Sequence, residues 1–119
     1  MCVQGVLEDA RGAAEEARRV RRLLKQCDRD ARDGRIVPQA YRASLLARLD
    51  RCARAVDEGQ AALDAMERAG TARGWVLDAL QMRYLDAMGW DEISAHLCYS
   101  KANVRRAVAA ALREPDREC

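Results

Sequence analysis

Apolar and small residues recur along the first 70 residues in alternating steps of four and three. The first series consists of Val6, Ala10, Ala13, Ala17, Val20, Leu24, Cys27 and Ala31. The second series consists of Leu45, Leu49, Cys52, Val56, Gly59, Leu63 and Met66. This heptad spacing is typical of helices that pack along their whole length. It predicts a long antiparallel helical hairpin, a coiled coil, over residues 1–70.

The segment between the two series contains helix-ending residues. Gly34 can end the first helix, and Pro38 can stand in the first turn of the second. Folding the chain back there gives one register, with the facing pairs Cys27 and Leu45, Ala17 and Val56, and Ala13 and Gly59. Because the last pair leaves little to fill the middle of the hairpin, we expect a third helix or a second copy of the arm to cover it. The hairpin is interpreted as a spacer or an oligomerisation arm.

The remaining residues, 71–119, show three shorter helical patterns. Gly70 can close the long helix and Thr71 can cap the next. That helix is expected to run to about Met88 and to bury Val76, Leu77, Leu80, Tyr84 and Met88. After Gly89, the sequence WDEISAHL places two carboxylates in the first turn of a helix, where they favour the positive end of its dipole. The predicted fold class is therefore all-α: a hairpin followed by a three-helix helix-turn-helix domain.

The last helix has an uneven distribution of charge. Ser100 is a suitable N-cap, and a buried stripe is expected at Val104, Ala107, Val108 and Ala111. The outward face is then Ala102, Arg105, Arg106, Ala109 and Arg113, with Lys101 in the first turn. The chain as a whole holds 21 basic and 19 acidic residues, yet residues 100–113 include four basic residues and no acidic one. A local bias of this kind is typical of a DNA-binding surface.

Composition excludes several other classes of protein. The five cysteines are scattered and His96 is the only histidine, so neither a metal site nor a cofactor is expected. No segment approaches the ~20 apolar residues of a membrane span, and no secretory signal is recognised, so we expect a cytoplasmic protein without membrane contact. No nucleophile stands beside a base, and no glycine-rich phosphate loop is present. We therefore expect no enzymatic activity.

A set of residues in the second half resembles a known family. These residues are Arg83, Tyr84, Leu85, Trp90, Asp91, Glu92, Ile93, Leu97, Tyr99, Ser100, Val104, Ala111 and Leu112. They resemble the sigma-factor region-four-like helix-turn-helix of phage and prophage transcriptional regulators of the RinA and ArpU type. The resemblance covers about a third of the chain. It implies sequence-specific binding to double-stranded DNA, control of phage or prophage genes, and a last helix that enters the major groove.

Carried over by position, the resemblance names Ser100 as the cap and Lys101, Ala102, Asn103, Arg105 and Arg106 as the reading residues. Arg113 is added from the charge pattern. Gly89 and Cys98 depart from the family, because a Ser or Thr cap often precedes the Trp, and Gly or Asn often fills the turn. A homodimer or higher homo-oligomer is expected, with RNA polymerase as an alternative partner.

Two other functions stay open on the sequence alone. One is a DNA-packaging recognition subunit resembling small terminase subunits, and the other is a helical protein-interaction module that binds no nucleic acid. A further basic cluster lies in the arm at Arg18, Arg19, Arg21, Arg22 and Lys25. Because Glu15, Glu16 and Asp28 flank it, the favoured interpretation is a charge-compensated, solvated face. The alternative is an accessory contact with the DNA backbone.

Overall fold

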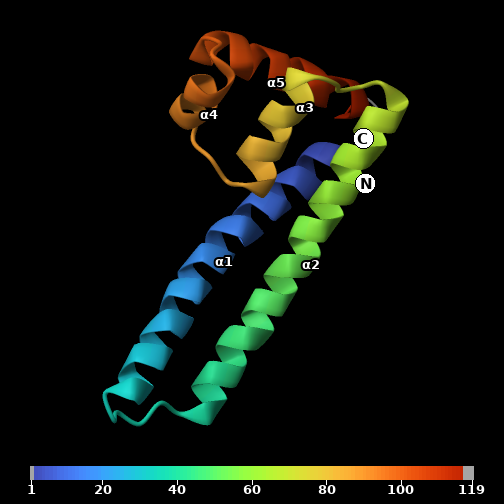
Figure 1. Ribbon diagram of the computed structural model, residues 1–119. Helices are drawn as coiled ribbons and strands as arrows, with labels where there is room; N and C mark the ends of the chain where they lie inside the picture. Colours follow the sequence, from blue (N-terminus) through green and yellow to red (C-terminus); the bar gives the residue numbers. More distant parts are fainter. Residues whose placement is uncertain (1, 117–119) are drawn as a thin grey trace.

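The computed structural model describes the backbone of residues 2–116 and the side chains as far as Arg113. Two long helices, α1 (Val3–Arg32) and α2 (Gln39–Ala69), lie antiparallel and form an extended hairpin (Figure 1). The remaining helices gather at the end of the hairpin where α1 begins and α2 ends. The described residues contain helices and no strand, which confirms the predicted all-α class.

The ends of the long helices follow the expected local chemistry. After α1 the chain turns through Gly34, whose φ of 81° suits glycine, and Pro38 stands at the N-cap of α2. Gly70 ends α2 with a φ of 77°. Its N–H donates to the carbonyl of Glu67 at 3.1 Å, and the N–H of Thr71 donates to Met66 at 2.9 Å. These glycines therefore end the helices as the sequence indicates.

The C-terminal helices begin and end differently from the sequence prediction. α3 (Trp75–Leu80) starts after Gly74 (φ 61°), and not at a Thr71 cap. It passes into a π-helical segment, η1 (Gln81–Leu85), and the chain then leaves the helix at Ala87 (φ 54°), before the expected end at Met88. α4 (Trp90–Leu97) and α5 (Lys101–Asp116) follow. The left-handed residue Ala87 interrupts the helical pattern, and periodicity alone does not reveal it.

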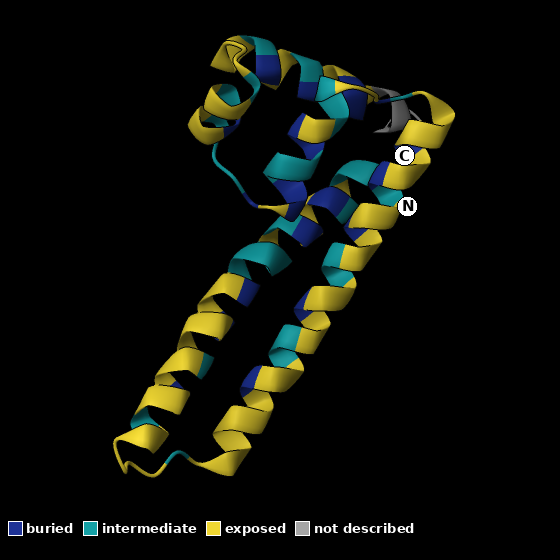
Figure 2. Ribbon diagram, in the orientation of Figure 1, coloured by how far each residue is buried: buried dark blue, intermediate teal, exposed yellow. Residues whose placement is uncertain are grey.

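The main core joins the hairpin to the C-terminal helices. Figure 2 shows buried residues gathered at the end of the hairpin that carries the shorter helices, whereas the other end is mostly exposed. The fully enclosed side chains of this core come from all parts of the chain: Leu7, Ala10, Leu63, Leu80, Ile93 and Val104. The predicted division at residue 70 therefore separates helices that share one core.

The register of the hairpin at Gly59 is not the expected one. A Cβ atom added to Gly59 would lie 2.6 Å from the Cβ of Ala10 and 2.8 Å from the Cδ2 of Leu85. Gly59 therefore faces Ala10, and the predicted pairing with Ala13 is wrong. Small side chains allow several close registers, and the one adopted lets η1 insert Leu85 at this point. Of the two expected covers, a third helix or a second copy of the arm, η1 supplies the first at Gly59 through Leu85.

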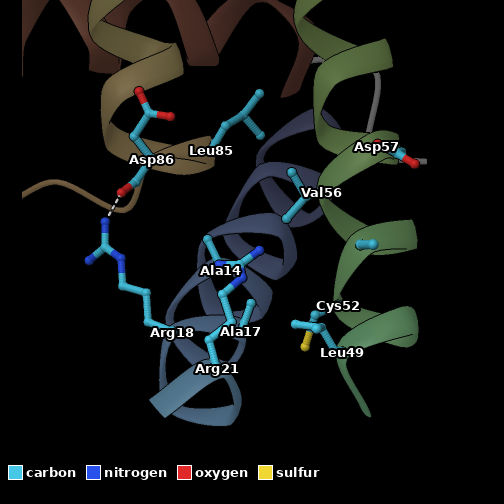
Figure 3. Close-up of a pocket in the computed structure, with 11 residues that line it drawn as sticks. Ala14, Ala17, Arg18, Arg21, Leu49, Cys52, Val56, Asp57, Leu85 and Asp86 are labelled. Carbon is cyan, nitrogen blue, oxygen red and sulfur yellow. Dashed lines mark hydrogen bonds between the residues drawn. The ribbon is translucent and has the colours of Figure 1, made fainter. Parts of the chain in front are cut away.

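A pocket of about 440 Å³, partly open to solvent, lies between the two long helices and is also lined by Leu85 and Asp86. Figure 3 shows its small lining residues, among them Ala14 and Ala17 on α1 and Cys52 on α2. Farther along, the hairpin has only a small second cluster of buried residues, Val20, Cys27 and Leu45. The predicted seam residue Ala31 is exposed. The heptad pattern therefore runs along the whole hairpin in the sequence, but few of its residues are buried in the half that lies nearer the loop between α1 and α2.

Candidate nucleic-acid interface

α4 begins at Gly89, where the sequence predicts a cap. The backbone N–H of Gly89 donates to Oε1 of Glu92 at 3.3 Å, and the N–H of Ile93 donates to the carbonyl of Gly89 at 3.1 Å. Asp91 and Glu92 occupy the first turn, as predicted. Glu92 therefore makes its half of a capping box, whereas Gly89 has no side chain to accept a backbone N–H of the first turn.

The turn between α4 and α5 is held from several sides. Cys98 adopts a left-handed conformation with φ 60°, and its N–H donates to the carbonyl of Ser94 at 2.9 Å. The hydroxyl of Ser94 donates to the carbonyl of Tyr99. The ring of Tyr99 stacks on Trp75, with centroids 4.4 Å apart. The turn that orients α5 is thus tied to both α4 and α3.

Ser100 caps α5 as predicted. Its Oγ accepts the backbone N–H of Asn103 at 3.1 Å, and its carbonyl accepts the N–H of Val104 at 3.0 Å. The buried stripe of α5 also matches the expectation at Val104, Val108 and Ala111, while Ala107 is half-buried. α5 therefore packs on the bundle by one face.

The opposite face of α5 is open over its described residues. The side chains at the five outward positions are all exposed: Ala102, Arg105, Arg106, Ala109 and Arg113. Lys101 is also exposed and lies 3.3 Å from Oδ1 of Asp91, a surface ion pair of the kind that contributes little to stability. Asn103 is half-buried. The hairpin does not cover the two central arginines, Arg105 and Arg106.

Two arginines approach the ring of Trp90. The guanidinium of Arg83 is 4.3 Å from the centre of the Trp90 ring, and that of Arg105 is 5.8 Å away. Burial lowers the pKa of Arg83, and the nearby charges of Arg11 and Arg105 lower it further. Because arginine remains protonated in proteins, Arg11, Arg83 and Arg105 form a cluster of positive charge beside Trp90, near the start of α5.

Two arginines of α1 hold the chain between η1 and α4. Arg11 donates to the carbonyls of Arg83 and Met88, the latter at 3.0 Å. Arg18 donates to the carbonyls of Asp86 and Ala87, and Figure 3 shows the first of these bonds. These hydrogen bonds could not be predicted from the sequence, because their acceptors are backbone carbonyls about 70 residues away and the spacing of side chains carries no information about them.

The described residues offer no other candidate chemistry. They contain no group of three or more His, Cys, Asp or Glu side chains placed to hold a metal ion. Cys27, Cys52 and Cys98 are free thiols, and Cys119 lies outside the described residues. None of the described helices is both long enough and apolar enough to cross a membrane.

Comparisons with protein-family models, with curated proteins and with solved structures found no match to this chain. The likeness to phage regulators therefore depends on the residues quoted from the sequence, and the function has to be argued from the geometry of the interface.

Proposed function

We propose that this protein is a sequence-specific DNA-binding transcriptional regulator of the phage or prophage type, with α5 as its recognition helix. The observation that carries the proposal is the outward face of α5. There, exposed Arg105 and Arg106 lie among the exposed alanines Ala102 and Ala109, and no acidic residue occurs on the described part of that face.

The side chains of this face suit a major groove. A helix that enters the groove must approach the base edges closely, and alanines permit this approach. Arginine donates in a bidentate manner to O6 and N7 of guanine. We assign Arg105 and Arg106 to the bases, with Ala102 and Asn103 beside them. We assign Lys101 and Arg113, which lie at the two ends of the described face, to phosphates.

One such helix is too weak a binder to select a site on its own. Non-specific affinities of this kind are ~10⁻⁴ to 10⁻⁶ M, whereas specific binding reaches ~10⁻⁸ M or better. A second recognition helix in a homodimer, or docking on RNA polymerase, would supply the difference. In a dimer the two half-sites would lie ~34 Å apart or a multiple of that distance.

The proposal is tested by selecting binding sites from random duplexes with the purified protein and then measuring affinities by fluorescence anisotropy. Arg105→Ala should weaken specific binding by roughly 1 to 3 kcal/mol and relax the preference at one base pair. Arg113→Ala should lower the affinity evenly across sequences, because a phosphate contact carries no sequence information. The control is Arg51→Ala, an exposed change on α2.

Two outcomes would contradict this assignment. Absence of salt-dependent binding to any duplex would exclude DNA as the partner. Equal, sequence-independent losses from Arg105→Ala and Arg113→Ala would exclude base reading by Arg105.

A further inference from the structure

The outer face of α1 carries a regular row of cations, here called the α1 stripe. Its members are Arg11, Arg18, Arg22, Lys25, Arg29 and Arg32, separated by steps of seven, four, three, four and three. Residues at this spacing share one face of a helix. All of them except the half-buried Arg11 are exposed. The stripe extends from the C-terminal helices to the far end of the arm.

Two of the three acids that lie near this row in the sequence, Glu16 and Asp28, pair with residues outside it. Glu15 pairs with Arg11 at 3.2 Å, at the start of the stripe. Glu16 pairs with Arg48 on α2 at 2.8 Å, and Asp28 pairs with Arg42 at 2.7 Å. Among the described residues, no carboxylate lies within ion-pair distance of three later members of the stripe, which are Arg22, Lys25 and Arg32. Within the basic cluster noted in the sequence, Arg19 pairs with Glu16 at 3.6 Å, whereas Arg22 and Lys25 make no ion pair with a described residue.

The stripe begins next to the cluster of arginines around Trp90. Arg11 and Arg18 hold the carbonyls of the chain that leads into α4, so this face of α1 meets the C-terminal helices. Arg83 lies next to Arg11 and stacks on Trp90, and Arg105 approaches the same ring. Cationic groups of α5, η1 and α1 thus lie next to one another, with Glu15 as the acid beside Arg11 and Arg83.

We propose that the α1 stripe binds the phosphate backbone of the duplex beside the site that α5 reads. This inference rests on the proposed function and extends it to the flanking DNA. From Arg11 to Arg32 the stripe is roughly 30 Å long at 1.5 Å per residue, which corresponds to about nine base pairs at 3.4 Å each. From Arg18 onward a cation recurs every three or four residues, so the row can meet successive phosphates of a duplex.

Duplex DNA fits the stripe better than a protein surface does. Stable protein interfaces have an apolar core that is depleted of charge. The outward positions of the stripe are all cationic, and the seam residues Val20 and Cys27 are buried against α2. An acidic segment of another protein would therefore find charge on this face but no apolar centre.

The test combines a triple variant with two lengths of DNA. The triple variant combines Arg22→Gln, Lys25→Gln and Arg29→Gln. It replaces three exposed cations by glutamine, a neutral residue that favours helix. Affinities are measured on duplexes of about 12 and about 30 base pairs that both contain the selected site. The wild type should bind the longer duplex more tightly. The triple variant should bind both duplexes alike, and its salt slope on the longer duplex should fall by about 0.9 for each phosphate that is no longer neutralised.

A matched control neutralises three exposed arginines of α2: Arg51→Gln, Arg54→Gln and Arg68→Gln. It should leave the preference for the longer duplex unchanged, and circular dichroism should show both triple variants as helical as the wild type.

If the stripe variant retains the wild-type length preference and salt slope, the inference is wrong while the proposed function stands. If the wild type binds neither duplex, both fail. If the stripe variant changes only the mass in solution, the stripe is an interface between copies of this chain.

Discussion

At the end of the hairpin where α1 begins, Leu7 and Ala10 are enclosed by α2 and by the C-terminal helices. At the other end, Val20 and Cys27 meet mainly Leu45 and a few half-buried neighbours. We call these regions the packed end and the distal arm. Both continue the same pair of helices with the same heptad spacing, yet only the packed end has a third layer.

The comparison shows what heptad spacing does and does not provide. It is sufficient to hold two helices side by side, but two thin helices leave large apolar side chains in contact with solvent. In the distal arm Leu23 is 39 % exposed, Tyr41 44 % and Leu46 49 %. At the packed end, Leu80, Ile93 and Leu63 are at most 2 % exposed. Stability therefore comes mainly from the end that also orients the recognition helix, and the arm depends on that end.

The two regions also differ in their turns. The loop of the distal arm has a glycine, Gly34, as its left-handed residue. The packed end has the glycines Gly70 and Gly74 and also Ala87 and Cys98, which carry side chains. A left-handed residue with a side chain is strained, and such strain persists only where the surroundings fix the backbone. The hydrogen bonds from Arg18 to Ala87 and from Cys98 to Ser94 supply that constraint.

The largest difference is expected from truncating one buried leucine in each region. Leu80→Ala at the packed end should lower the free energy of unfolding by about 4 to 5 kcal/mol, the upper part of the usual range. Three layers of helices meet there, so the structure could not close around the space that the missing side chain leaves. Leu45→Ala in the distal arm should cost about 2 kcal/mol, since the thin arm can relax around the smaller residue. Urea unfolding followed by circular dichroism measures both effects. Equal effects would mean that the distal arm is packed as tightly as the other end.

A second test concerns two glycines in the long helices. Gly59→Ala should lower the free energy of unfolding by about 1 to 2 kcal/mol, because the new Cβ would collide with Ala10 and Leu85, and overpacking outweighs the better helix propensity of alanine. Gly12→Ala is the matched control, since nothing lies within 4 Å of its Cβ position. It should raise stability by about 0.5 to 1 kcal/mol. A gain from both substitutions would show that α1, α2 and η1 do not meet at Gly59.

Much of the fold was predictable because local chemistry determines it. Gly70 ends α2, Ser100 caps α5 and the buried stripe of α5 contains Val104, as the sequence indicates. The register at Gly59 was not predictable. Alanine and glycine at the seam fit several alignments almost equally, and the choice is made by Leu85, a residue far away in sequence.

The candidate site was predictable in its outline only. The period of α5 correctly placed Arg105 and Arg106 on an exposed face. Glu16 pairs with its sequence neighbour Arg19, but the sequence did not reveal that Glu16 and Asp28 also pair across the hairpin with Arg48 and Arg42. Such partners are decided by which helix lies alongside, and this information is tertiary. The reading roles of the α5 residues remain predictions.

The smallest expected effect concerns the strained turn before α5. Cys98→Gly should raise stability by about 0.5 kcal/mol, since relief of a left-handed side chain exceeds the entropy that glycine adds to the unfolded chain. The substitution removes only a weak hydrogen bond from the thiol to the carbonyl of Ala95, at 3.9 Å. The control in the distal arm is Gly34→Ala, which should cost about 1 kcal/mol. Thermal unfolding should show shifts of about 2 °C upward and about 4 °C downward. A lower stability of Cys98→Gly would mean that the thiol, and not the backbone, holds this turn.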